Sequence, residues 1–234
     1  MFTEAIRQDI ENFLHTKVHS SLNEEMCYMW YENEYDDCGD EDFSGVCFAC
    51  GADRYANGVS KITLFYNDLV DWVIKVPILG NYYEEEDNYR DYEQSGAIKE
   101  NDYCLAESDY CEEALHQNIG QCFAKTYYVC NINGINFYCS ERVAIVYHDK
   151  YHYGDTVTYT KPHSYAQAKH LLACYDSYLA VEELALFVDA YGEQITQQLI
   201  KFLYEWDISD LHHGNLGFDA NNNIKIIDCA GWRD

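Results

Sequence analysis

The chain is short of basic residues. Among 234 residues it has 15 Lys plus Arg against 41 Asp plus Glu, which gives a formal net charge of −26. Binding to a phosphate backbone needs clustered Lys and Arg, and anionic membrane surfaces attract polybasic segments. The composition therefore argues against direct nucleic-acid binding and against membrane binding. No apolar run approaches the roughly 20 residues of a membrane span.

We expect that the first residues are not a secretory signal, because MFTEAIRQDIENF is amphipathic and carries acids. The 11 cysteines are an odd number, so we expect reduced thiols and a cytoplasmic location. Cys47 and Cys50 form a CxxC with Cys38 upstream, but the second tight pair of a zinc knuckle is absent. We expect structural or incidental cysteines, and metal binding by this CxxC stays open.

What the chain does have is enough apolar material for a core, with 48% hydrophobic and 16% aromatic residues. Despite the charge, this predicts a folded protein. The patterns indicate an α+β chain in which strands come first and helices later. The expected elements are a helix at 3–18, strands in SGVCFACG, VSKITLFYN and LVDWVIKVP, a helix at 103–118, strands at 122–148 around an Asn133-Gly134 turn, helices from 163 to 206, and a closing β-hairpin.

The most informative stretch is DISDLHHGNLGFDANNNIKIIDCAG at 207–231. Asp210 is followed five residues later by Asn215, and Asp228 ends the apolar strand IKIID. Phosphoryl transfer needs an oxygen base beside the attacking hydroxyl and oxygen ligands that hold Mg²⁺ against nucleotide phosphates. An Asp and an Asn on one loop, with a second Asp at a strand end, meet that need.

On these residues the chain resembles the protein-kinase-like superfamily, in particular the atypical branch whose catalytic loop reads like DLHxGN, as in aminoglycoside and choline kinases. It is most similar to short kinase-like proteins of bacteriophages and mobile elements. The resemblance implies ATP and Mg²⁺ as cofactors, Asp210 as catalytic base, and Asn215 and Asp228 as metal ligands. It implies that His213 orients the loop or contacts phosphate.

The resemblance places the other half of the site on the early strands. Lys75 in WVIKVP stands where the family keeps its catalytic, phosphate-binding lysine, and its apolar neighbours favour a buried, partnered side chain. The partner is expected on the next helix, with Glu107 first and Glu112 or Glu113 as alternatives. SERVAIVY, which contains Glu141, resembles the segment that links the lobes and holds adenine.

Two features depart from the family. The first hairpin has Gly45, Gly51 and Gly58 but no GxGxxG, and Asp228-Cys229-Ala230-Gly231 has one more residue than DFG. The sequence given ends three residues after Gly231. We therefore expect a truncated two-lobe kinase-like fold without the peptide-docking half of a full protein kinase.

The expected division has three parts: an N-terminal helix and acidic extension at 1–43, an N-lobe at 44–148 with an acidic insertion at 81–102, and a shortened C-lobe at 149–234. The first hypothesis is a phosphotransferase of unknown substrate, with a pseudokinase or nucleotidylyltransferase as variants. The alternative is a non-catalytic acidic protein that mimics DNA and inhibits a basic host partner, in the host cytoplasm if phage-encoded. The oligomeric state stays open.

Overall fold

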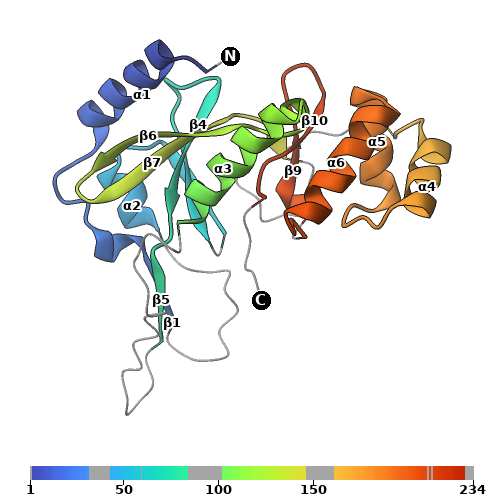
Figure 1. Cartoon of the computed structure of the whole chain (residues 1–234). Helices are drawn as coiled ribbons and strands as arrows, with labels where there is room; N and C mark the ends of the chain where they lie inside the picture. The colour runs from blue at the N-terminus through green and yellow to red at the C-terminus, as the bar shows by residue number, and fades with distance from the viewer. Residues whose placement is uncertain are drawn as a thin grey trace. The chain divides into compact units, whose positions relative to one another are not determined.

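The computed structural model describes residues 2–31, 43–58, 60–83, 102–145, 161–209, 211 and 213–229. Within them the chain is α+β (Figure 1), as the sequence predicts. It divides into two compact units, unit 1 with residues 1–105 and 127–140 and unit 2 with residues 106–126 and 141–234. The described helices are α1 (Glu4–Lys17), α2 (Ser44–Ala49), α3 (Tyr103–His116), α4 (Tyr165–Cys174), α5 (Val181–Tyr191) and α6 (Glu193–Glu205), with short 3₁₀ turns η1 (Glu24–Cys27), η2 (Gly120–Cys122) and η3 (His213–Asn215).

The described strands form three sheets. Unit 1 is built on a five-stranded sheet in the order β2-β3-β4-β7-β6, and smaller sheets have the orders β1-β5 and β10-β9-β8. The strands are β1 (Tyr28–Tyr31), β2 (Arg54–Asn57), β3 (Lys61–Phe65), β4 (Trp72–Pro77), β5 (Gly80–Tyr83), β6 (Thr126–Ile132), β7 (Ile135–Glu141), β8 (Ala144–Ile145), β9 (Leu216–Phe218) and β10 (Ile224–Ile226).

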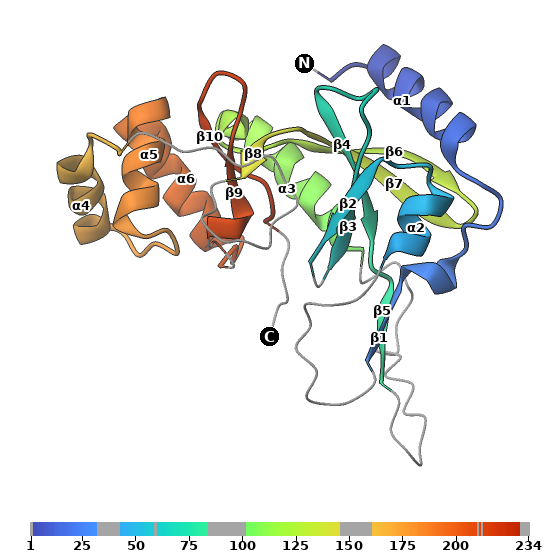
Figure 2. The same cartoon turned by 180° about the vertical axis from the view of Figure 1, so that it is seen from behind.

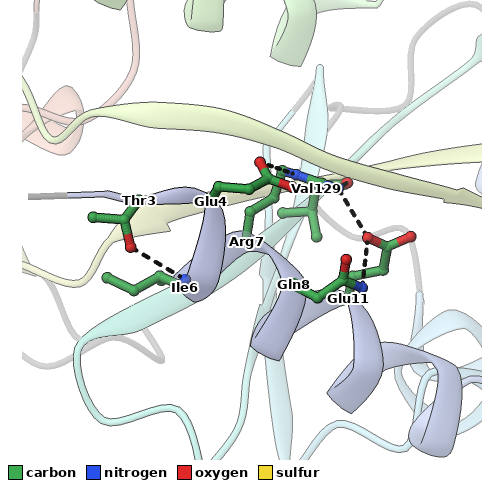
Figure 3. A network of polar contacts seen from close by, with 7 residues as sticks. All are labelled: Thr3, Glu4, Ile6, Arg7, Gln8, Glu11 and Val129. Carbon is green, nitrogen blue, oxygen red and sulfur yellow. Dashed lines mark hydrogen bonds and ion pairs between the residues drawn. The ribbon is translucent and has the colours of Figure 1, made fainter.

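The N-terminal helix α1 forms where the sequence predicts it. Thr3 caps its first turn through its side-chain oxygen. Arg7 then joins the helix to the sheet: its guanidinium reaches Glu4 at 2.6 Å and Glu11 at 2.8 Å, and donates to the Val129 carbonyl of β6 at 2.9 Å (Figure 3). One of the few cations of the chain is thus used to attach a helix.

The two faces of the five-stranded sheet differ in chemistry. Strands β2, β3 and β4 run antiparallel, so side chains alternate between the faces. One face belongs to a single apolar core with α1 and α2 (Figure 2). The other face carries Lys61, Thr63 and Lys75. The core face contributes Ile62, Leu64, Ile74, Val76, Ile135, Phe137 and Cys139, and the helices add Ile10, Leu14, Val46 and Ala49.

The prediction of a strand in SGVCFACG is wrong, because this segment forms α2. Val46 and Ala49, three residues apart, are buried on one side of the helix at 1% exposure each. The helix ends before Gly51, whose φ of 61° suits glycine. A short apolar run fits both helix and strand periods, and the packing partner decides between them. The first strand of the sheet is instead β2.

The sequence patterns do not predict the two-stranded ribbon that β1 forms with β5. The strands pair in parallel, with Tyr28 opposite Gly80 and Tyr31 opposite Tyr83. In the sequence, the acidic segments 32–42 and 84–101 each begin directly after this ribbon. The segment 81–102, predicted to be an acidic insertion, therefore starts as a strand. Pairing between segments some fifty residues apart leaves no local signal in the sequence.

The helix predicted at 103–118 is α3, and the hairpin predicted at Asn133-Gly134 joins β6 to β7 with φ values of 55° and 89°. Asp102 precedes α3 and is 6% exposed. Its carboxylate accepts from the Leu105 amide at 3.0 Å and from the Tyr138 hydroxyl at 2.6 Å. This contact caps the helix and joins its start to β7.

Unit 2 contains the helical region predicted after residue 163. It forms three helices, with a break between Cys174 and Val181 and a second at Gly192, whose φ is 82°. Buried side chains of α5 and α6 make its core, including Leu184, Phe187, Leu199 and Leu203. No helix among the described residues combines the length and apolarity needed to span a membrane.

The Asp102 cap yields a test of stability. We expect Tyr138→Phe to lower the free energy of unfolding by about 1–3 kcal/mol, because it removes a donor from a buried carboxylate. The matched control is Tyr128→Phe, on a side chain that is 44% exposed; we expect it to change stability by less than about 0.5 kcal/mol. Urea unfolding followed by circular dichroism measures both, and equal effects would contradict the role given to Asp102.

Candidate functional site

The loop that carries the sequence motif begins at the end of α6. Asp207 has a left-handed backbone with a φ of 51°, and the Tyr178 hydroxyl donates to its carboxylate at 2.9 Å. Ile208 next to it is buried at 3% exposure. These contacts fix the entry to the loop. Asp210, the predicted catalytic base, and His212 lie outside the described residues, and of His213 only the backbone, at the start of η3, is described.

A hairpin fixes the exit of the loop and joins two predicted metal ligands. Asn215 ends η3 and is 8% exposed. Strands β9 and β10 then pair antiparallel, with Leu216 opposite Ile226. Beyond this pair, the Ile227 amide donates to the Asn215 carbonyl at 2.9 Å. Asp228, half-buried, is the next residue, so the hairpin brings Asn215 and Asp228 to the same end of the β9–β10 ladder.

The turn of this hairpin is organised by one carboxylate. Asp219 accepts from the amides of Asn221 and Asn223 at 2.9 Å each. Asn222 takes a left-handed backbone, with a φ of 62°. Asp and Asn favour such turns because their side chains bond nearby backbone amides and tolerate positive φ. The DANNN sequence thus sets the length of the hairpin.

A buried lysine holds the second strand. Lys225, in the middle of β10, is 7% exposed. Its ammonium group donates to the Gln121 carbonyl at 2.7 Å and lies 3.4 Å from the Asp219 carboxylate. A backbone hydrogen bond attaches the same edge of β10: the Ala124 amide donates to the Ile226 carbonyl at 2.8 Å. Strand β10 is therefore bonded along both edges.

The charge state of Asp219 follows from these contacts. Burial by itself would raise its pKa, but the bonds from Asn223, the charge of Lys225 and the Asn221 amide together lower the pKa below its usual 3.8. A lowered pKa in the folded state means that the ionised form stabilises the fold above the unfolded pKa. That stabilisation is lost as the pH falls below about 4.

The expected loss of stability at low pH can be tested with the variant Asp219→Asn. We expect the variant to be less stable than the parent by about 1 kcal/mol at pH 7 and the difference to shrink as the pH falls below about 4, because the parent then progressively loses the same charge. Thermal unfolding between pH 3 and 7 measures the difference. Asp68→Asn is the control, since the Asp68 side chain is 69% exposed and pairs with Lys17 at the surface. A pH-independent difference for Asp219→Asn would contradict this account.

The predicted lysine and glutamate lie on the elements that the sequence indicates. Lys75 is in β4 of unit 1, opposite Thr63, and is 5% exposed. Glu107 is in α3, in the part that belongs to unit 2, and is 1% exposed. The Thr126 hydroxyl donates to its carboxylate at 3.2 Å. The Lys75–Glu107 ion pair stays a prediction.

The alternatives to Glu107 are much more exposed. Glu112, with 77% of its side chain exposed, lies 3.9 Å from His116. Glu113 accepts a bond from Gln117 on the same helix at 3.0 Å. Of the three candidates, Glu107 alone is buried, as the partner of a buried cation should be.

The segment predicted to hold adenine is attached to the hairpin sheet. Glu141 ends β7 and pairs with Lys125 at 3.5 Å. Strand β8 then pairs with β9, with Ile145 opposite Gly217. Gly217 allows this approach: a Cβ there would lie 2.9 Å from the Ala144 carbonyl oxygen. The close packing therefore connects the SERVAIVY segment to the strand that follows Asn215.

The remaining sequence predictions concern metal ligands, cysteines and the acidic segments. Among the residues that the structure describes, no group of three or more His, Cys, Asp or Glu side chains is arranged to hold a metal ion. The predicted ligand pair of one amide and one carboxylate would leave other positions to nucleotide and water. Ten cysteines lie among the described residues and form no disulfide with one another, and Cys50 is fully buried. Both acidic segments, 32–42 and 84–101, lie outside the described residues, so the basic-partner prediction stays a prediction.

Sequence reasoning missed Lys225, Asp219 and Lys61. Lys225 stands between two isoleucines, which is the same signal that singled out Lys75 between Ile74 and Val76. Lys61, in KITLF, is 4% exposed and shows no comparable apolar flank on both sides. Its position on the face of Lys75 becomes visible only from strand register.

The chain has little similarity to known proteins. No family model and no curated protein matches the chain. Two solved structures of WbdD, a bifunctional kinase–methyltransferase, are similar to it at 14% and 13% identity, each with a TM-score of 0.32. One of them is a complex with the kinase inhibitor LY294002. The match covers 76% of this chain but 32% and 33% of the WbdD chains, so this chain spans about a third of their length. A similarity of this size carries no argument about function.

Proposed function

We propose that the chain is a kinase-like phosphotransferase that binds ATP with Mg²⁺. The observation that carries the proposal is the hairpin contact between the Ile227 amide and the Asn215 carbonyl, at 2.9 Å. It puts the residues Asn215 and Asp228 at the same end of a short ladder. Amide and carboxylate oxygens are ligands that Mg²⁺ accepts beside phosphate oxygens.

The donor set fits the expected group. A magnesium ion bound there would neutralise charge on the transferring phosphoryl group. Asn215 is held between η3 and β9, and the residue before Asp228 is bonded to it. Backbone bonds thus hold both residues in place, which would limit the ordering that Mg²⁺ binding requires.

The remaining roles follow from the family resemblance. Asp210 would accept the proton of the substrate hydroxyl, and Lys75 would contact phosphate with Glu107 as its partner. His213 would orient the loop or contact phosphate, and the segment at Glu141 would hold adenine through its backbone. The substrate class is a small molecule, a bound protein, or the chain itself. Adenylyl transfer and nucleotide binding without turnover are variants of the same site.

The test is binding and turnover of Mg·ATP with Asp228→Ala. We expect the parent to bind ATP in a Mg²⁺-dependent manner and Asp228→Ala to weaken that binding at least tenfold, because a metal ligand is lost. Isothermal titration with and without Mg²⁺ measures the affinity, and release of ADP measures turnover.

The matched control is Asn222→Gly, which alters the far end of the same hairpin at a position with positive φ. We expect it to retain Mg²⁺-dependent binding. If the parent protein binds no nucleotide, the proposal is wrong. If Asp228→Ala binds Mg·ATP as tightly as the parent, the metal-ligand role of this hairpin is wrong.

A further inference from the structure

Helix α6 ends on an unusual residue at the point where the chain enters the loop of the sequence motif. The Ile208 amide donates to the Leu203 carbonyl at 2.8 Å. The Asp207 amide donates to the Tyr204 carbonyl at 3.3 Å. Two such bonds close a helix through a residue with a left-handed backbone, which is usually glycine and sometimes asparagine. Here that residue is Asp207, with a φ of 51°.

Other helix ends of the chain carry the residues that this position prefers. Positive φ occurs at Gly51 after α2, at Asn118 after α3 and at Gly192 after α5. Among the described residues, Asp207 alone combines a charged side chain with positive φ. A left-handed backbone costs free energy in a residue with a Cβ, so glycine would give a more favourable helix end. The carboxylate at this position therefore needs a reason other than the closing of the helix.

The Asp207 carboxylate is bonded to Tyr178, whose hydroxyl donates to it at 2.9 Å. The Tyr178 ring stacks on Tyr204 in the last turn of α6, with 6.1 Å between the ring centroids and 20° between the ring planes. The next residue, Leu179, is 2% exposed, and its amide donates to the Ser177 hydroxyl oxygen at 3.1 Å. Tyr178 is therefore held by the stacked ring on one side and by a buried neighbour on the other.

Stability alone does not account for this bond. Tyr178 is 37% exposed and Asp207 is also exposed. A hydrogen bond at the surface replaces bonds to water, so its net contribution to folding is small. Strained residues that are held by their surroundings occur preferentially at active sites. Asp207 fits that description, since it stands three residues before Asp210, the predicted catalytic base.

The residues after Asp207 attach the loop to unit 2. Ile208 and Leu211 are buried, at 3% and 8% exposure. The Leu211 amide donates to the Ser209 carbonyl at 2.8 Å. The backbone torsion at Asp207 thus sets the direction in which the chain leaves α6 toward Asp210. A general base must lie within hydrogen-bond reach of the proton that it accepts, so a small change of that direction lowers the rate.

We propose that Asp207, bonded to Tyr178, is a positioning residue that directs the catalytic loop of the proposed phosphotransferase. The inference rests on the function proposed above and adds two residues to it. Neither residue contacts nucleotide in this role, because the bond acts through the loop backbone. The predicted metal ligands Asn215 and Asp228 are held separately by the β9–β10 hairpin. A change at Asp207 therefore lowers the rate of turnover and leaves Mg·ATP binding intact.

The experiment compares Asp207→Gly with the parent by release of ADP from Mg·ATP, isothermal titration of Mg·ATP and thermal unfolding. We expect kcat to fall by about tenfold or more, because the bond is lost and glycine permits other loop conformations. The dissociation constant for Mg·ATP should change by less than about twofold. The midpoint of thermal unfolding should stay equal or rise, because the left-handed backbone suits glycine. A residue with only a structural role would not combine a lower kcat with unreduced stability.

Three further variants identify the bond as the cause. Asp207→Asn keeps an acceptor for the Tyr178 hydroxyl and tolerates positive φ, so it should retain most of kcat. Tyr178→Phe removes the donor and should lower kcat as Asp207→Gly does, and the two changes together should add no further loss. Tyr204→Phe is the matched control, since it keeps the ring that stacks on Tyr178; its kcat and thermal unfolding should equal those of the parent.

The outcomes separate this inference from the proposed function. If the parent binds no Mg·ATP, the proposed function fails and the inference fails with it. If the parent binds Mg·ATP and releases no ADP, the inference is wrong and only the nucleotide-binding part of the proposed function stands. If the parent turns over Mg·ATP and Asp207→Gly or Tyr178→Phe does so at the same rate, the inference is wrong and the proposed function stands. A fall in kcat that accompanies a lower unfolding midpoint in Asp207→Gly, or an Asp207→Asn variant as slow as Asp207→Gly, also overturns it.

Discussion

Strand β10 is bonded along both edges, and the candidate metal site depends on this constraint. On one side it pairs with β9, and the Ile227 amide continues the pairing to Asn215. On the other side the Ala124 amide bonds to the Ile226 carbonyl, and the Lys225 ammonium group reaches the Gln121 carbonyl. A strand of three residues would be weak alone. Attached on both sides, it holds Asp228 in a fixed relation to Asn215.

The five-stranded sheet of unit 1 separates two kinds of chemistry by its pleat. The face toward α1 and α2 is apolar and supplies the core. The opposite face carries Lys61, Lys75 and the β7 residue Tyr138, which binds Asp102. Because side chains alternate strictly, a shift of β4 by one residue against β3 would bring Lys75 to the core face and take Ile74 out of the core. The apolar core therefore enforces the position of both lysines.

In a chain with a net charge of −26, the structure shows where some of the few basic residues lie. Some of the 15 basic residues, such as Lys17, Lys169 and Lys201, are exposed, but four others are buried or half-buried. Arg7 attaches α1 to β6, Lys225 attaches β10, and Lys61 and Lys75 are buried on one sheet face. Part of the scarce positive charge is therefore found inside the units, where two of these side chains attach an element. The acids are concentrated in the segments that follow the β1–β5 ribbon.

Local sequence signals determined much of the fold: the Thr3 cap of α1, the helix α3, the Asn133-Gly134 hairpin and the DANNN turn each depend on nearby residues. They also named Asn215 and Asp228 and put Lys75 and Glu107 on the elements that carry them. Tertiary structure alone decided that SGVCFA is a helix and that β1 pairs with β5, because those outcomes depend on distant packing and pairing partners. It also decided that Lys61 lies beside Lys75, since strand register is set by which face the core covers.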